Sequence, residues 1–269
     1  MGSRLQPDFE RNAAFHDQTA PEYDDQLARS PADVLARTAF RDLVARYVAA
    51  GSTLLDFGCG TGLDAFEYAQ QGYRVLAYDN SPGMVDQLRR RCESQIASGR
   101  VTPYSMPYPS FLECFPQWPA PSAVAADFAV LNSIRDLEPL FEALGRRLTA
   151  PGWVIASILN PLHWSKVRTR GWWRDAVRAP RGPRIHTTQP YVSYLHFVPA
   201  LLRAARSFHL VGRANAGTLV RYDAANPPDE RSWWSSSASP SRGFTRLLWH
   251  SPASRLLGHF MFLVLRRDP

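Results

Sequence analysis

Four residues in one short stretch have the clearest chemical meaning. Asp56 stands just before a G-x-G-x-G pattern made by Gly58, Gly60 and Gly62. Glycine lets the backbone approach a ligand closely, whereas a carboxylate repels phosphate and accepts a hydrogen bond from an ammonium group, directly or through water. Leu63 follows Gly62, so the pattern is not the G-x-G-x-x-G loop that binds a pyrophosphate. The stretch therefore predicts a site for a cationic nucleoside without a phosphate.

The elements that must position these residues are a strand and a helix. Thr53–Phe57 is a short apolar and β-branched run that predicts a buried strand, and Leu63–Gln71 has apolar residues at roughly helical spacing. Strand, glycine loop and helix begin a nucleotide-binding α/β unit. A second predicted strand, Arg74–Tyr78, ends at Asp79, 17 positions after Gly62. That distance is close to the one at which an acidic residue binds ribose hydroxyls.

Two motifs resemble those of one enzyme family. Asp56–Gly62 is similar to the first motif of the class I S-adenosylmethionine-dependent methyltransferases, and Asp79–Met84 resembles the family's D-x-S-x-x-M motif. The resemblance covers roughly residues 10 to 160 and implies S-adenosyl-L-methionine as cofactor, a phosphate-free cation. It also implies an α/β, Rossmann-like, doubly wound seven-stranded sheet, mostly parallel with an antiparallel last strand. An N-terminal helical lid and an insertion after strand five complete the expected fold.

The resemblance also implies which residues bind the cofactor. Phe15–Asp24 is similar to the lead-in segment of small-molecule methyltransferases, which folds over the cofactor. We expect Arg37 to lie on a solvated helix face. The third strand is followed by Ser105–Pro107 and not by an acidic residue, which leaves adenine recognition to apolar packing or backbone groups. The expected cofactor-binding residues are Tyr23, Asp56, Gly58, Cys59, Gly60, Gly62, Asp79, Asn80, Met84, Leu131 and Asn132.

The expected organisation has four parts. These are a helical lid (1–50), an S-adenosylmethionine-binding core (51–160), an acceptor-binding insertion or lid (161–206) and C-terminal strands that complete the sheet (207–269). We expect further strands at 100–105, 127–134, 153–159, 208–213 and 256–266, and helices at 32–49, 83–96, 137–148 and 190–205. Five prolines predict a loop at 107–121.

Composition and charge narrow the class of protein. The chain has 269 residues, 45% of them hydrophobic, and its three cysteines show no paired or metal-ligand spacing. We therefore expect no metal and a reducing, cytoplasmic location. Residues 1–150 hold 14 arginines and 19 acidic residues, a net charge of −5, whereas residues 151–269 hold 17 basic and 5 acidic residues, a net charge of +12.

The basic segment 163–184 contains seven lysines or arginines, one acidic residue and three tryptophans. It is compatible with a lid over an anionic or lipid-like substrate, a membrane-surface patch, a nucleic-acid contact or a solvated loop. No N-P-P-Y or D-P-P-Y motif follows the fourth predicted strand, which argues against a nucleic-acid base as acceptor. We therefore expect a small-molecule or lipid-like acceptor that carries an acidic group, and peripheral membrane contact stays open.

Methyl transfer is an in-line displacement at an activated carbon, so the protein mainly positions its reactants. A general base is needed only for a hydroxyl or an acidic carbon, and the candidates in the expected lids are His16, His163 and Tyr191. Two other functions stay open: a nucleic-acid-directed methyltransferase and a non-catalytic cofactor-binding protein. Leu63 disfavours a dinucleotide oxidoreductase. The acceptor, the methylated atom and the oligomeric state stay undetermined at this point.

Overall fold

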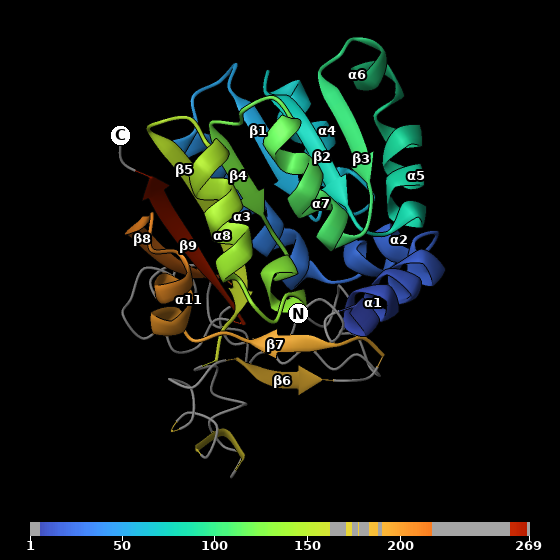
Figure 1. Cartoon of the computed structure of the whole chain (residues 1–269). Coiled ribbons are helices and arrows are strands. Elements are labelled where there is room, and N and C mark those ends of the chain that lie inside the picture. The colour runs from blue at the N-terminus through green and yellow to red at the C-terminus, as the bar shows by residue number, and fades with distance from the viewer. Residues whose placement is uncertain are drawn as a thin grey trace, which may run out of the picture.

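A computed structural model of the protein describes residues 6–161, 171–173, 177, 183–187, 190–216 and 259–267. Seven of its strands form one sheet in the order β3-β2-β1-β4-β5-β9-β8 (Figure 1). These strands are β1 (Thr53–Phe57), β2 (Arg74–Asp79), β3 (Val101–Ser105), β4 (Ala123–Ala126), β5 (Gly152–Leu159), β8 (His209–Ala216) and β9 (Phe260–Arg267).

The strand directions confirm the predicted fold class. β1 pairs in parallel with both β2 and β4, while β3 pairs in parallel with β2, and β5 with β4. β9 is antiparallel to both of its neighbours, β5 and β8. The sheet is therefore mostly parallel, and its last strand in sequence is the antiparallel one.

Helices cover both faces of the sheet, so its central strands are buried on both sides. On one face, Leu55 and Phe57 of β1 share a core with Phe111 and Phe141, whereas Leu54 packs on the other face with side chains such as Phe40, Tyr68 and Leu88. In Figure 1, α7 and α8 lie in front of the sheet and α3 and α4 behind it. The helices are α1 (Gln6–Thr19), α2 (Tyr23–Ala28), α3 (Pro31–Tyr47), α4 (Leu63–Gln70), α5 (Pro82–Arg91), α6 (Glu93–Ala97), α7 (Tyr108–Cys114), α8 (Glu138–Arg147) and α11 (Val198–Ala204).

The fourth strand differs from its prediction. β4 covers Ala123–Ala126, and the segment 127–134 that was predicted as a strand turns instead. Phe128 and Ala129 have positive φ angles of 48° and 58°, and a 3₁₀ turn, η2 (Val130–Ser133), follows. A positive φ is costly for residues other than glycine, and two in succession end the extended backbone. The apolar residues of 127–134, which suggested a strand, instead form a turn at the end of the sheet.

Two other predictions of secondary structure were wrong. The loop expected at 107–121 contains α7 and a 3₁₀ turn, η1 (Phe115–Gln117). Pro107 and Pro109 lie at the start of α7 and Pro116 at the start of η1, where a missing N–H costs nothing, whereas Pro119 and Pro121 follow both elements. The helix expected at 190–205 is shorter than predicted: it is α11 (Val198–Ala204), and the strand β7 (Ser193–Leu195) stands before it.

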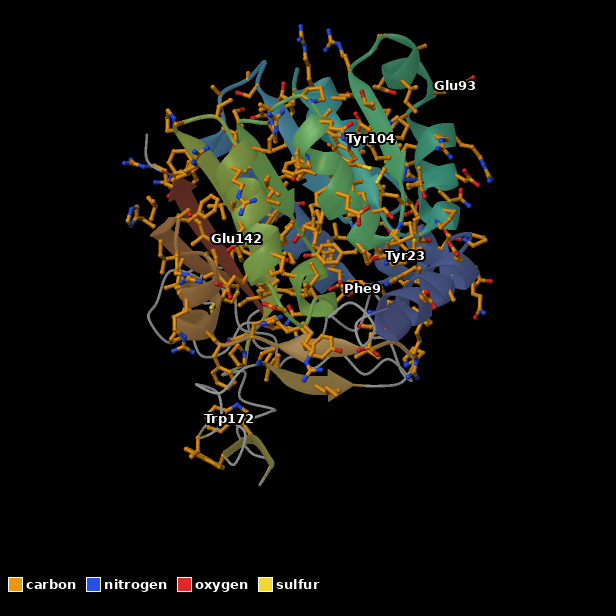
Figure 2. The ribbon with its side chains drawn as sticks, in the orientation of Figure 1. Phe9, Tyr23, Glu93, Tyr104, Glu142 and Trp172 are labelled. Atoms are coloured by element: carbon orange, nitrogen blue, oxygen red, sulfur yellow. The ribbon has the colours of Figure 1, made fainter. Side chains whose placement is uncertain are left out.

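The insertion after β5 contributes a small second sheet. Within it, β6 (Arg184–Thr187) pairs with β7 in antiparallel fashion. Figure 1 shows this pair below the end of the main sheet, next to α1. In Figure 2, Phe9 and Tyr23 lie nearer to this end than Tyr104 does. The end of the sheet that holds the predicted site is thus covered by elements from two distant parts of the chain.

Candidate active site

A cavity of about 430 Å³ lies at the carboxyl ends of β1, β2 and β4. Ligands of doubly wound sheets bind at such ends. Of the residues expected to bind the cofactor, those that line this cavity are Tyr23, Gly58, Gly60, Asp79, Asn80, Met84 and Asn132. The other expected residues, Asp56, Cys59, Gly62 and Leu131, are not among its lining residues. Most of the predicted cofactor-binding residues therefore line one cavity, and the other four do not.

The glycine loop is held against the end of β2. The backbone N–H groups of Gly58 and Cys59 donate to the carbonyl oxygen of Tyr78 at 2.8 and 2.9 Å. A side chain at Gly58 would meet Val130 at 2.3 Å, whereas one at Gly60 would meet no atom within 4 Å. Gly58 is thus required by packing against η2, while Gly60 leaves open space on the cavity side. A ligand that lies close to the backbone fits this space.

Asp79 is fixed in place by both of its carboxylate oxygens. One accepts a hydrogen bond from the backbone N–H of Gly60 at 2.9 Å, and the other accepts from the N–H of Ser81 at 2.9 Å. Burial raises the pKa of Asp79, and these backbone hydrogen bonds oppose that shift. A carboxylate oxygen has more than one lone pair, so Asp79 can also accept hydrogen bonds from ribose hydroxyls in the cavity.

Asp56 is buried, and its Oδ2 atom has no hydrogen-bond partner. Its pKa is raised by burial and by the nearby carboxylate of Asp64. Asp127, at the end of β4, likewise has a buried Oδ2 without a partner, and burial raises its pKa to about 7. Buried polar groups normally have partners, so this acidic end of the site fits the ammonium group of a methionine-type ligand.

Arg37 does not lie on a solvated helix face, as was expected from the sequence. Its guanidinium contacts the Asp64 carboxylate at 2.5 Å, and its side chain is only 13% exposed. It also lies 4.5 Å from the centre of the Phe128 ring. Arg41 makes a second contact with Asp64, at 2.6 Å. A charged ligand group that binds Arg37 would therefore compete with an existing ion pair.

The N-terminal helices are attached to the two cofactor motifs. Oδ1 of Asp17 on α1 accepts hydrogen bonds from the Ser81 hydroxyl at 2.6 Å and from the Gly83 N–H at 2.8 Å, at the start of α5. On α2, Asp24 accepts from the Thr61 hydroxyl and from the Arg91 guanidinium, both at 2.5 Å. The predicted lid therefore contacts both the glycine loop and the helix that follows Asp79.

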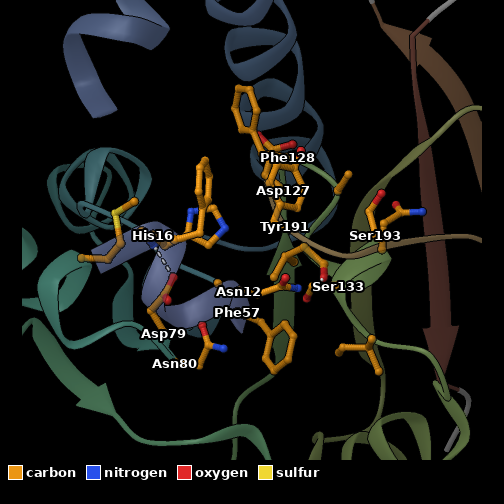
Figure 3. A pocket seen from close by; sticks show the side chains of 18 of the residues that line it. Asn12, His16, Phe57, Asp79, Asn80, Asp127, Phe128, Ser133, Tyr191 and Ser193 are labelled. Atoms are coloured by element: carbon orange, nitrogen blue, oxygen red, sulfur yellow. Dashed lines mark hydrogen bonds between the residues drawn. The ribbon is translucent and has the colours of Figure 1, made fainter. Parts of the chain in front are cut away.

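Aromatic side chains from the lid and the insertion meet over the cavity. The rings of His16 and Tyr191 are 5.9 Å apart, and Phe15 lies 5.3 Å from Tyr191. Burial lowers the pKa of His16, and the Asp79 and Asp17 carboxylates oppose part of that shift. Tyr23 also lies beside His16, and burial raises its pKa. Figure 3 shows His16, Tyr191 and Asp79 around the same space. Two of the three catalytic candidates, His16 and Tyr191, are thus close together, whereas His163 lies outside the described residues.

Several cavity residues were missed by the sequence analysis. Phe9 and Asn12 precede His16 by seven and four positions, so all three lie on one face of α1. That helical spacing could have identified them. Tyr108 stacks on Phe9, with ring centres 4.7 Å apart, but it stood in the segment predicted as a loop. Ser193 had no recognisable signal, because its place depends on the fold of the insertion.

The described residues also bear on metal binding and on membrane insertion. Among the described residues, no group of histidine, cysteine and acidic side chains is arranged to hold a metal ion. Within the same ranges, no helix has the length and hydrophobicity needed to cross a bilayer. Most of the basic segment 163–184, with Arg168, Arg170 and Arg174, lies outside the described residues.

Comparisons with known proteins identify a methyltransferase domain in the chain. Residues 54–149 match the family model of a methyltransferase domain. A 41-residue stretch is 46% identical to a cypemycin N-terminal methyltransferase from Streptomyces, but this match covers 15% of the chain and 17% of that relative. The chain thus shares only a small part of its length with the curated relative.

Solved structures show the same fold. A Burkholderia thailandensis 1,6-didemethyltoxoflavin-N1-methyltransferase, solved with 1,6-didemethyltoxoflavin and S-adenosylhomocysteine, superposes with a TM-score of 0.55 and 16% identity, over 100% of this chain and 94% of that one. The [4+2]-cyclase SpnF superposes with a TM-score of 0.57 and 18% identity, over 86% and 81% of the two chains. Residues 54–149 therefore match a methyltransferase domain, and the chain has the fold of the S-adenosylmethionine-dependent methyltransferases that its motifs resemble.

Proposed function

We propose that the protein transfers a methyl group from S-adenosylmethionine to a small-molecule acceptor bound between the sheet and the roof formed by α1, α2 and β7. The observation that carries this proposal is the arrangement of Asp79 and the glycine loop. The Asp79 carboxylate is fixed by Gly60 and Ser81 at the edge of a cavity that is open above Gly60. This arrangement suits a nucleoside whose ribose hydroxyls bind Asp79.

The residues at either end of the cavity fit the two ends of the cofactor. Asp127 lines the cavity with a buried carboxylate oxygen that has no partner, which suits a ligand ammonium group. Met84 is buried and lines the cavity near Asn80, so it can pack on the adenine ring. The cofactor supplies a methyl group that is already activated, and the chain's own residues then have to orient two molecules and exclude water.

Orientation is the largest contribution that this chain can make. Holding two reactants in line can lower a barrier by roughly 7–11 kcal/mol. The contacts of Asp17 and Asp24 hold the lid against the cofactor motifs, so the roof can exclude water. His16 has a lowered pKa and is neutral at pH 7, which allows it to accept a proton if the acceptor is a hydroxyl. An amine acceptor can lose its proton after the transfer.

Two named relatives support a nitrogen acceptor. One is described as an N-terminal methyltransferase and the other as an N1-methyltransferase. The sequence-based expectation of an acidic acceptor rests on arginines outside the described residues and stays a prediction. We further propose that the parts 1–50 and 161–206 act as the lid and the acceptor-binding insertion around the core.

Binding and label transfer test this function separately. Calorimetric titration should show binding of S-adenosylhomocysteine and none of NADH. Because the same fold also occurs in a cyclase, turnover must be followed by transfer of a labelled methyl group to the acceptor. Failure of S-adenosylhomocysteine to bind the folded protein would refute the proposal.

A further inference from the structure

Ser193 on β7 has an unusual environment for a polar residue. It is 3% exposed and lines the cavity, yet its hydroxyl oxygen has no hydrogen-bond partner. Figure 3 shows its side chain on the far side of the cavity from His16 and Asp79. A buried hydroxyl without a partner lowers stability, so its position calls for a physical explanation.

The residues on both sides of Ser193 are fixed. Val192 exchanges two hydrogen bonds with the Asn12 side chain, at 2.9 and 2.8 Å, and the carbonyl oxygen of Tyr194 accepts a hydrogen bond from the Asn132 amide. Successive side chains of a strand point in opposite directions. Ser193 is therefore held by its neighbours with its side chain directed away from those of Val192 and Tyr194.

A second polar atom over the cavity also lacks a partner. Nδ1 of His16 is buried and makes no hydrogen bond, and the rings of Phe15 and Tyr191 lie beside His16. The roof thus combines flat aromatic surfaces with two hydrogen-bonding atoms that no protein group satisfies. This combination suits a ring-containing ligand with polar groups at its edge.

The charge of the cavity wall limits the ligand further. Three carboxylates, those of Asp33, Asp79 and Asp127, line the cavity, and the lining residues that the structure describes include no lysine or arginine. Within the described lining, the ionised carboxylates would repel a negatively charged ligand, whereas they would not repel a neutral molecule or a protonated amine.

We propose that Ser193 is a specificity-determining residue of the acceptor subsite, and that this subsite takes an aromatic molecule that is neutral or bears an amine, in place of the acidic acceptor expected from the basic segment 163–184. This inference rests on the proposed function, because it assigns the acceptor part of the same site. Ser193 forms a hydrogen bond with a polar edge group of the acceptor, and the aromatic roof contacts its ring.

Three probes that share one ring and differ in charge test the acceptor class. Tryptamine, tryptophol and indole-3-acetate are titrated at pH 7.5 into protein saturated with S-adenosylhomocysteine, and binding is followed by ligand-observed NMR. Tryptamine and tryptophol should bind at least about threefold more tightly than indole-3-acetate, a difference of about 0.6 kcal/mol. Equal or tighter binding of indole-3-acetate, or no binding of any probe, would overturn the proposal.

The Ser193→Ala variant tests the residue itself. Its Kd for tryptophol should rise roughly 3- to 10-fold, as for loss of one hydrogen bond, while its Kd for S-adenosylhomocysteine stays unchanged. Its Tm should not fall, because the removed hydroxyl has no partner in the protein. Ser98→Ala, at an exposed position, is the matched control and should bind tryptophol like the original protein.

The two proposals fail in different ways. If S-adenosylhomocysteine does not bind the unmodified protein, the proposed function fails. If it binds but Ser193→Ala leaves the Kd for tryptophol unchanged, or lowers the Tm as a structural role would, the assignment of Ser193 fails alone.

Discussion

Asn12 and Val192 stand 180 positions apart in sequence and exchange two hydrogen bonds. The Asn12 side-chain amide donates to the Val192 carbonyl oxygen at 2.9 Å, and its oxygen accepts from the Val192 N–H at 2.8 Å. Both residues are buried. The asparagine therefore acts as a short strand partner for the backbone beside β7, and it joins the N-terminal helix to the insertion directly over the cavity.

Replacing this asparagine should destabilise the roof. In Asn12→Ala, the N–H and C=O groups of Val192 lose their partners, which should lower the free energy of unfolding by about 1–3 kcal/mol. Urea denaturation measures this change. Gln18→Ala, at an exposed position on the same helix, is the control. Equal stability of the two variants would show that the hydrogen bonds between Asn12 and Val192 contribute nothing measurable to the free energy of unfolding.

Asp79 should contribute to cofactor binding. We expect Asp79→Ala to weaken S-adenosylhomocysteine binding by about 1.5–3 kcal/mol, the range for a hydrogen bond to a charged group. Calorimetry on the folded variant tests this, with Asp86→Ala as control because Asp86 lies on an exposed helix surface, where it pairs with Arg89. An unchanged Kd in Asp79→Ala would contradict its assignment.

Asp17 should couple the lid to the cofactor. Its carboxylate binds the start of α5, directly after the Asp79 motif, so a bound cofactor should protect the segment 10–30 from proteolysis. Asp17→Ala should reduce that protection, whereas Asp25→Ala, at an exposed position on α2, should keep it. Timed digestion with and without S-adenosylhomocysteine measures the effect. Identical cleavage rates in all cases would exclude a coupled lid.

Asp127 should make stability depend on pH. Its pKa in the folded protein is about 7, raised by burial from 3.8, so the unfolded chain loses this proton first as pH rises. The contribution of Asp127 is therefore fully present below about pH 4 and is lost as pH rises through about 7. Asp127→Asn carries no charge and should increase the Tm more at pH 8 than at pH 4.5.

Calorimetric scans at the two pH values test this prediction. Asp42→Asn, at an exposed position on α3, is the control and should show a smaller pH-dependent difference. The prediction fails if the Tm change caused by Asp127→Asn is the same at both pH values.

The sequence predicted the part of the site that depends on local patterns. Asp56, the glycine loop and Asp79 are each set by a strand and the turn that follows it, so their order along the chain indicates their place in space. The same reasoning failed at Asp127–Ile134, because hydrophobicity suggested an extended run and gave no sign of the positive φ angles at Phe128 and Ala129.

The acceptor side was harder to predict because it depends on contacts between distant segments. Ser193 reaches the cavity only because β7 is held by Asn12 on one side and Asn132 on the other. Arg37 was expected to be solvated, since its helix position gave no sign of the Asp64 carboxylate 27 positions later. Pairings of this kind are set by tertiary packing and leave no periodic signal.

The place of β9 also has a consequence for how the protein is made. β9 is synthesised after β8 but lies between β8 and β5, and more than 100 positions separate the end of β5 at Leu159 from Phe260. Closing so long a loop is slow relative to local folding. Until β9 leaves the ribosome, β5 presents an unpaired apolar edge, and such edges promote aggregation. Nascent chains of this protein should therefore depend on a chaperone until their last strand has been inserted.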